Sequence, residues 1–227
     1  MKKIVVLTGA GISAESGINT FRDSNGLWEG HDVMEVASPM GWKKNKEKVL
    51  DFYNKRRSQL FEVSPNEAHK ALAALEKKYD VSIITQNVDD LHERSGSSKV
   101  LHLHGELLKV RSTRNPNLIY DWKKDLILGD FCEENSQLRP HIVWFGENVP
   151  MFDKALEITS EADILIVVGT SMQVYPAAHL INCAKPSVSI YFIDPKPTIQ
   201  QNLYSNLTVL AEKASLGVVK VVDLLIG

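Results

Sequence analysis

The stretch KIVVLTGAGISAESG, residues 3–17, decides the fold class. Its first half is a short apolar, β-branched run, typical of a buried parallel strand that is followed by a loop and a helix. Gly9, Gly11 and Ala14 match the pattern G-x-G-x-x-G/A, whose small residues allow a tight turn and a close approach of the backbone to a pyrophosphate. The stretch indicates a dinucleotide-binding loop, although a tight turn without a ligand has the same pattern.

Similar apolar runs recur at 81–87, 99–105, 163–171, 189–194 and 207–213, with helical patterns between them. The segment SPNEAHKALAALEKKYD predicts a helix in which Ser64 is the N-cap, Pro65 occupies the first helical position and Glu67 closes a capping box. Strands that alternate with helices predict an α/β fold, a Rossmann-like parallel sheet with helices on both faces.

Two stretches interrupt this alternation. Residues 31–62 have a helical pattern without a strand, and residues 106–146 are irregular. We therefore expect an NAD-binding domain made of residues 1–30, 63–105 and 147–227, and a smaller module built from the two insertions, 31–62 and 106–146.

The composition is that of an ordinary globular protein able to bury a core, since 44% of the 227 residues are hydrophobic and 24% are charged. A formal net charge of −2 gives no sign of a nucleic-acid or membrane partner. Cys132 and Cys183 form no CxxC pair, which argues against a disulfide framework. The first apolar run, Ile4 to Leu7, is too short for a signal peptide, so we expect a cytoplasmic protein.

Polar or glycine-rich segments follow several predicted strands. They are Gln86-Asn87-Val88-Asp89, Gly169-Thr170-Ser171 and Asp194. Ligands of open α/β sheets bind beyond the carboxyl ends of the strands, so these segments predict one shared cleft. The sequence lacks an acidic residue at the end of a second strand about 20 residues after the glycine-rich loop, so it does not support an ordinary NAD dehydrogenase.

Two pairs of side chains leave alternatives open at this point. His102 and His104 lie two apart in an apolar run, where a metal would need further ligands and where His104 fits either strand packing or a general base at the cleft. Tyr53 and Arg56 share one helix face. Their spacing alone favours an aromatic residue packed beside a surface arginine.

Six stretches taken together resemble the sirtuins, a family of NAD-dependent protein-lysine deacylases. They are GAGISAESGINTFRDSNGLW, TQNVDDLHERSG, LHGELLKVR, LRPHIVWFGENVP, VVGTSMQVYPAA and IDPKP, in the order of the family and over nearly the whole chain. The resemblance implies a Rossmann-like domain and a small helical, zinc-binding module, with NAD and acylated-lysine proteins or peptides bound in the cleft between them.

The resemblance also implies roles for individual residues. His104 resembles the base that deprotonates a ribose hydroxyl after the acyl oxygen has displaced nicotinamide. The resemblance implies that Asn87 and Asp89 are catalytic residues as well. The implied cofactor-binding residues are Gly9, Ala10, Gly11, Ile12, Ser13, Phe21, Arg22, Gln86, Asn87, Asp89, Gly169, Thr170, Ser171 and Asp194. The implied strand that pairs with the substrate backbone consists of Val143, Trp144, Phe145, Gly146 and Glu147.

The acyl group is also suggested by the resemblance. Sirtuins that prefer succinyl-, malonyl- or glutaryl-lysine carry Tyr-x-x-Arg where this chain has Tyr53 and Arg56, so the resemblance favours an acidic acyl group over simple acetyl. Two other enzyme or binding functions remain as alternatives: an NADase or ADP-ribosyltransferase, and a non-catalytic module that senses NAD.

The chain departs from most sirtuins at the zinc site. The first CxxC pair of the family falls near Ser112 and Asn115, and the second near Phe131 and Glu134, where Cys132 is the only cysteine, so we expect no structural zinc. The expected replacement is apolar packing by Leu118, Ile119, Tyr120, Trp122, Leu126, Ile127 and Leu128. Asp194 stands where the family usually has Asn.

Overall fold

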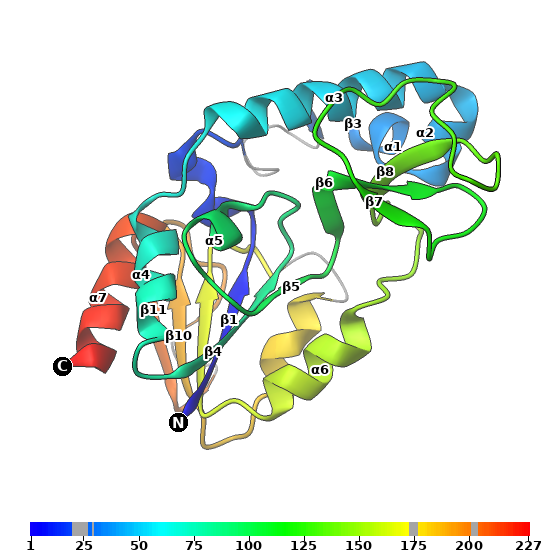
Figure 1. The fold of residues 1–227 in the computed structure, drawn as a ribbon. Coiled ribbons are helices and arrows are strands. Elements are labelled where there is room, and N and C mark those ends of the chain that lie inside the picture. The colour runs from blue at the N-terminus through cyan, green and yellow to red at the C-terminus, as the bar shows by residue number, and fades with distance from the viewer. Residues whose placement is uncertain (20–26, 29, 173–176, 201–203) are drawn as a thin grey trace.

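The computed structural model describes residues 1–19, 27–28, 30–172, 177–200 and 204–227. A parallel sheet of six strands forms the larger part, in the order β11-β10-β9-β1-β4-β5 (Figure 1). The strands are β1 (Lys3–Thr8), β4 (Asp80–Thr85), β5 (Val100–His102), β9 (Ile164–Val168), β10 (Ser189–Ile193) and β11 (Leu207–Leu210). The predicted fold class is confirmed, because the runs chosen for their apolar continuity are the strands of this sheet.

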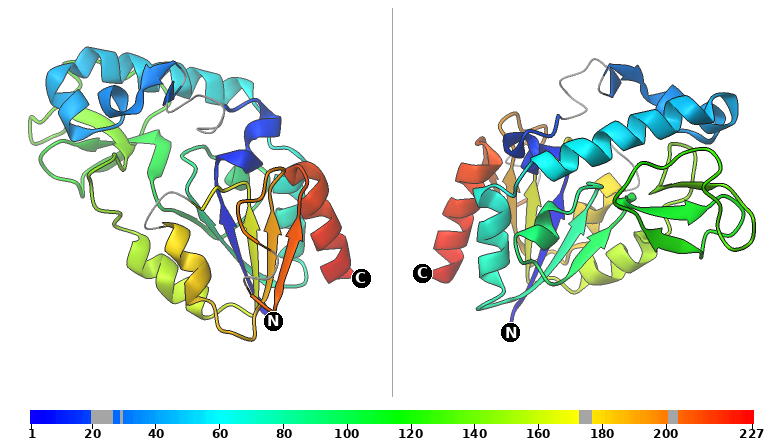
Figure 2. Two further views of the ribbon diagram at one scale, coloured as in Figure 1. Left: turned by 180° about the vertical axis from the view of Figure 1, so that it is seen from behind. Right: turned by 45° about the horizontal axis from the view of Figure 1, so that its top comes forward.

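Helices cover both faces of the sheet (Figure 2). On one face, α4 (Glu67–Leu75) and α7 (Ala214–Ile226) pack over Ile4 and Val6 of β1. On the other, α6 (Phe152–Ser160) and the 3-10 helix η4 (Ala177–Cys183) pack over Val5 and Leu7. Successive side chains of a strand point to opposite faces, so β1 supplies both halves of the core. No helix in the described part of the chain is long and apolar enough to cross a membrane.

The turn after β1 differs from the prediction of a helix. Two 3-10 turns, η1 (Ala10–Ile12) and η2 (Ala14–Ser16), follow the strand instead. Gly17 then ends the segment with φ of +98°, a left-handed conformation that glycine adopts without a steric penalty. The loop is therefore compact and is held by turns rather than by a long helix.

The predicted cap of α4 is also wrong. Asn66, not Ser64, is the N-cap: its side chain accepts a hydrogen bond from Ala68 N, and His69 Nδ1 accepts one from Asn66 N. Asn66 Nδ2 donates to Ile12 O at 2.8 Å and to Ser16 Oγ at 3.0 Å. Because Asn66 is anchored to the glycine-rich loop, the helix begins two residues later than the pattern suggested.

The smaller module combines helices with an antiparallel sheet (Figures 1 and 2). Its helices are α1 (Val33–Val36), α2 (Pro39–Lys44) and α3 (Lys46–Glu62), and its sheet has the order β7-β6-β8. These strands are β6 (Gly105–Ser112), β7 (Ile119–Asp121) and β8 (Leu138–Ile142), and a short pair is formed by β2 (Leu27–Trp28) and β3 (His31–Asp32). The expectations of an irregular 106–146 and a strand-free 31–62 were therefore wrong.

Apolar packing holds the outer part of this module together. Leu126 is fully buried among Leu50, Val110, Cys132 and Leu138. Of the residues expected to pack here, Leu118, Tyr120 and Trp122 join this cluster at its edge. The expectation fails for Ile119, Ile127 and Leu128, whose exposed fractions are 43%, 60% and 44%. The packing is thus supplied as much by α3 and β8 as by the segment between the strands.

Candidate active site

The carboxyl ends of four parallel strands lie level at one edge of the sheet. Thr8 of β1 is in register with Thr85 of β4 and with Val168 of β9, and Val168 is in register with Ile193 of β10. The polar segments that follow these strands therefore meet at this edge, as the sequence predicted.

The glycine-rich loop packs against the turn that follows β9. Gly11 N donates to Gly169 O at 2.8 Å, and Gly169 has φ of +61°. A Cβ atom on Gly11 would lie 2.6 Å from Gly169 Cα, and one on Gly9 would lie 2.8 Å from Gly169 O. Side chains at these positions would push the two loops apart. The glycines thus keep backbone N–H groups close together, an arrangement that fits the pyrophosphate of a dinucleotide.

A buried hydrogen-bond network joins this loop to the end of β4. Asn87 Nδ2 donates to Ser13 Oγ at 3.1 Å, and Ser13 Oγ donates to Asp89 Oδ2 at 3.0 Å. Gln86 Nε2 donates to Thr170 Oγ1 at 3.1 Å, which ties β4 to the turn after β9. Burial raises the pKa of Asp89, while hydrogen bonds from Leu91 N and Ser13 lower it. These polar groups fit the ribose and amide of a nicotinamide nucleotide.

His104 lies between the two sheets. β5 ends at His102, so His104 stands two residues beyond the strand rather than at its last residue. Its Nδ1 donates to Gln86 O at 3.0 Å, since a carbonyl oxygen can only accept. That bond selects the tautomer with an unprotonated Nε2, and burial lowers the pKa of the ring despite the bond to Gln86. His104 is thus a neutral imidazole suited to act as a general base.

His102 contacts other residues of the site through both ring nitrogens, and among the described residues it belongs to no group of three side chains that could hold a metal ion. Its two ring nitrogens lie 3.0 Å from Asn87 O and 2.7 Å from Glu93 Oε1. Burial lowers the pKa of His102, but the hydrogen bond and charge of Glu93 outweigh burial and raise it. Glu93, on α5 (Leu91–Arg94), was not singled out in the sequence, where only its position in the segment after Asp89 could have indicated it.

The structure describes the positions of most of the remaining predicted cofactor residues. Asp194 is 3% exposed and accepts a hydrogen bond from Lys196 N at 2.8 Å, beyond the end of β10. Ser171 lies in the turn after β9, where its carbonyl accepts from Thr198 Oγ1 at 3.0 Å. The Ile12 side chain packs in the core, so Ile12 can offer only its backbone to a cofactor. Ala10 is the first residue of the same turn, η1. Phe21 and Arg22 lie outside the described residues.

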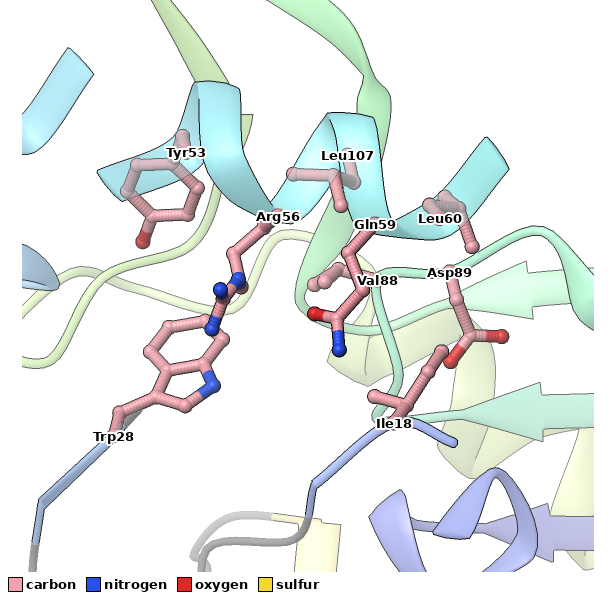
Figure 3. A pocket seen from close by; sticks show the side chains of 9 residues that line it. All are labelled: Ile18, Trp28, Tyr53, Arg56, Gln59, Leu60, Val88, Asp89 and Leu107. Atoms are coloured by element: carbon pink, nitrogen blue, oxygen red, sulfur yellow. The ribbon is translucent and has the colours of Figure 1, made fainter. Parts of the chain in front are cut away.

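Tyr53 and Arg56 line one pocket beside this network (Figure 3). The other lining residues are Ile18, Trp28, Gln59, Leu60, Val88, Asp89 and Leu107. Tyr53 is fully buried, and burial raises the pKa of its phenol, which therefore stays protonated. The Arg56 guanidinium lies 5.6 Å from the ring of Phe52. The interpretation of Arg56 as a plain surface arginine is wrong, because its side chain points into this pocket with Trp28 and Gln59 around it.

The segment Val143–Glu147 is a turn and not the expected strand, because β8 ends at Ile142. Glu147 causes the turn: its Oε2 accepts a hydrogen bond from Trp144 N at 2.8 Å, and Gly146 has φ of +90°. Val143 N donates to His104 O at 2.9 Å, so the segment begins beside the candidate base. Whether it pairs with a substrate backbone stays a prediction.

The comparisons with known proteins agree with this geometry. The Sir2 family matches residues 9–176. The chain belongs to the Sir2 family. An NAD-dependent protein deacylase of Helicobacter pylori (strain ATCC 700392 / 26695) is 68% identical over 196 residues, which cover 86% of either chain. One of Bacteroides thetaiotaomicron is 50% identical over 232 residues, 100% of this chain and 99% of the relative.

Solved Sir2 structures share the whole fold. A Sir2 homologue in complex with NAD has a TM-score of 0.88 and 41% identity, and the match covers 98% of this chain and 88% of that one. Sir2 bound to acetylated peptide has a TM-score of 0.78 and 30% identity, covering 97% and 92%. The two ligands of these Sir2 proteins are the ones that the sequence predicted for the cleft.

Hydrogen bonds occupy the place where the resemblance implied zinc ligands. Ser112 Oγ accepts from Asn115 N at 3.2 Å, and Asn115 Nδ2 donates to Glu134 Oε1 at 3.1 Å. A hydrogen bond with Ser112 lowers the pKa of Cys132. Within the described ranges no three histidine, cysteine or acidic side chains are grouped so that they could hold a metal ion. The segments at Asn115 and Glu134 are thus joined by a direct hydrogen bond.

Proposed function

We propose that this Sir2 protein is an NAD-dependent protein deacylase that prefers acidic acyl groups, such as succinyl and malonyl, on lysine. Family membership and the deacylase relatives support the deacylase activity, and the acetylated-peptide complex of a solved Sir2 structure supports acylated peptides as substrates. The observation that carries the acidic preference is the pairing of Tyr53 with Arg56 in one pocket.

A carboxylate in a mostly apolar pocket requires a cation and hydrogen-bond donors. Arg56 supplies a planar guanidinium that matches a carboxylate, and Tyr53 supplies a phenol that burial keeps protonated. The rest of the lining is largely apolar and would follow the methylene groups of a succinyl chain. An acetyl group would gain nothing from the arginine, because it ends in a methyl.

The polar network positions the other half of the reaction. NAD, when bound, supplies the glycosidic bond that is broken and the ribose that receives the acyl group. Hydrogen bonds with the Ser13 hydroxyl fix the orientations of the Asn87 and Asp89 side chains. His104 takes a proton at Nε2, because Nδ1 already carries one that it donates to Gln86 O. Asn87 and Asp89 thus orient the bound nucleotide, and His104 accepts the proton.

The test compares nicotinamide release from NAD with succinyl-lysine, acetyl-lysine or no peptide. We expect the highest kcat/KM with the succinyl peptide, and O-succinyl-ADP-ribose as a product in mass spectrometry. Arg56→Met should lower kcat/KM for the succinyl peptide by roughly 10- to 150-fold, the loss of hydrogen bonds to a charged group, and spare acetyl turnover. Lys55→Met is the control, because Lys55 is an exposed cation on the same helix.

The outcomes separate the alternatives. Faster turnover of acetyl- than succinyl-lysine by the unmodified protein would rule out the acidic preference. Nicotinamide release without any peptide would favour an NADase, and binding of NAD without release would favour a sensing module.

A further inference from the structure

The Tyr53 hydroxyl is held in one orientation by a residue on a distant segment. Trp144 Nε1 donates a hydrogen bond to the Tyr53 hydroxyl oxygen at 3.0 Å. Both side chains are buried, with exposed fractions of 2% for Trp144 and 0% for Tyr53. An indole N–H can only donate, so the phenol oxygen is the acceptor in this bond. The hydroxyl proton must therefore point away from Trp144.

Trp144 is itself fixed on three sides. Its backbone N donates to Glu147 Oε2 at 2.8 Å. The Arg139 guanidinium stacks on its ring, with Cζ 3.3 Å from the ring centroid, and Arg139 donates to Glu147 Oε1 at 2.6 Å and Oε2 at 3.1 Å. Trp42 packs against it with ring centroids 5.7 Å apart. The indole N–H is thus directed at Tyr53 by a salt-bridged cluster and not by loose packing.

The proton direction matters for the acyl group. A phenol whose oxygen is unpaired can turn its O–H in the ring plane, and in one orientation it presents a lone pair to the ligand. A carboxylate accepts hydrogen bonds and donates none, so a lone pair facing it is repulsive. A phenol whose oxygen already accepts from Trp144 presents its proton. The Tyr53 hydroxyl can then act only as a donor on its other side, and Tyr53 lines the same pocket as Arg56.

We infer that Trp144 is a specificity-positioning residue, which fixes the Tyr53 hydroxyl as a donor and so favours an acidic over a neutral acyl group. The inference rests on the proposed function, because it needs an acyl carboxylate in this pocket. It goes further in assigning part of the selectivity to a tryptophan that does not line the pocket.

The test is a double-mutant cycle read as the ratio of kcat/KM for succinyl- to acetyl-lysine peptides. Tyr53→Phe should lower the ratio by roughly 10- to 150-fold, and Trp144→Phe by about 2- to 12-fold, the range for one neutral hydrogen bond. In the Tyr53→Phe background, Trp144→Phe should change the ratio no further, since the hydroxyl it acts through is gone. Trp122→Phe is the control and should leave the ratio unchanged, because the Trp122 indole lies in the other cluster of the module, where it donates to Asp125 O.

Each result has one meaning. A wild-type protein without succinyl preference overturns the proposed function, and the inference falls with it. A wild-type preference that Tyr53→Phe abolishes and Trp144→Phe leaves intact overturns the inference alone, as do additive effects in the double variant. A loss of ratio on Trp144→Phe that disappears in the Tyr53→Phe background supports it.

A second measurement does not depend on Trp144→Phe folding. The chain has four tryptophans, so a ¹⁵N spectrum should contain four indole N–H signals. Tyr53→Phe should shift one of these signals and speed its exchange with solvent hydrogen. Four unchanged signals would show that the bond does not exist in solution, which overturns the inference.

Discussion

Asn54→Ala should destabilise the small module, because this one side chain joins α3 to the segment after β7. Asn54 Nδ2 donates to Leu126 O at 3.0 Å, and Asn54 Oδ1 accepts from Leu126 N at 2.9 Å and from Arg57 Nη1 at 2.7 Å. Arg57 is 1% exposed, and burial lowers its pKa to about 10. Without Asn54, the guanidinium keeps the hydrogen bond from its Nε to Leu107 O, at 3.3 Å.

The expected loss follows from these contacts. Two neutral hydrogen bonds contribute about 1 kcal/mol each, and one to a charged donor about 1.5–3 kcal/mol. The free energy of unfolding, measured by urea titration, should therefore fall by about 3.5–5 kcal/mol. Hydrogen exchange should show the loss first in β6 and β8, before the parallel sheet.

Ser58→Ala is the matched control, because Ser58 is exposed on the same helix. If the two variants differ by less than about 1 kcal/mol, or if protection is lost evenly over both sheets, the assignment of Asn54 as the joint of this module is wrong.

The other predictions concern the base, the buried histidines, the glycine loop and metal content. His104→Ala should lower kcat/KM by roughly 10²- to 10⁴-fold. The wild-type rate should fall as the pH drops through the lowered pKa of His104. His69 packs on His92, and burial lowers the pKa of His69 to about 4. The free energy of unfolding should therefore decline by up to about 3 kcal/mol as the pH falls from 6.5 to 4. His69→Gln should make this decline smaller. Gly11→Ala should weaken NAD binding in calorimetry, since the new Cβ would lie 2.6 Å from Gly169 Cα; unchanged affinity would contradict the close approach of the loops. Purified protein should hold no stoichiometric metal, and chelators should leave its unfolding midpoint unchanged; one tightly bound equivalent would refute this.

The parallel sheet could be predicted from the sequence because its strands are covered on both faces. All residues of β9 and all but the first of β1 are buried, so each strand is a continuous apolar run. The meeting of Gln86 with Thr170 followed from the same reasoning, since parallel strands bring their carboxyl ends to one edge.

The antiparallel sheet could not be predicted in the same way. Buried and partly buried residues alternate over the first three residues of β6, and two partly buried residues then follow each other. The alternation breaks because the register of the strand shifts between Gly105 and Val110. That shift breaks the period of two that marks a half-buried strand. Lys109 and Arg111 in the partly buried positions also gave the segment the composition of a loop.

Contacts between distant segments were the other missing information. Trp144 and Tyr53 are 91 residues apart, and neither residue type predicts the other as a partner. The turn at Glu147 depends likewise on its salt bridge with Arg139, which overrides the strand tendency of Val143 and Trp144.

His104 joins the two sheets through two different bonds. Its ring donates to Gln86 O at the end of β4, and its carbonyl accepts from Val143 N at the end of β8. Rotation of the antiparallel module against the parallel sheet would break one of them. Loss of the ring bond would remove the acceptor that keeps the proton on Nδ1. A change in the relative orientation of the two modules would therefore also change the proton affinity of the base.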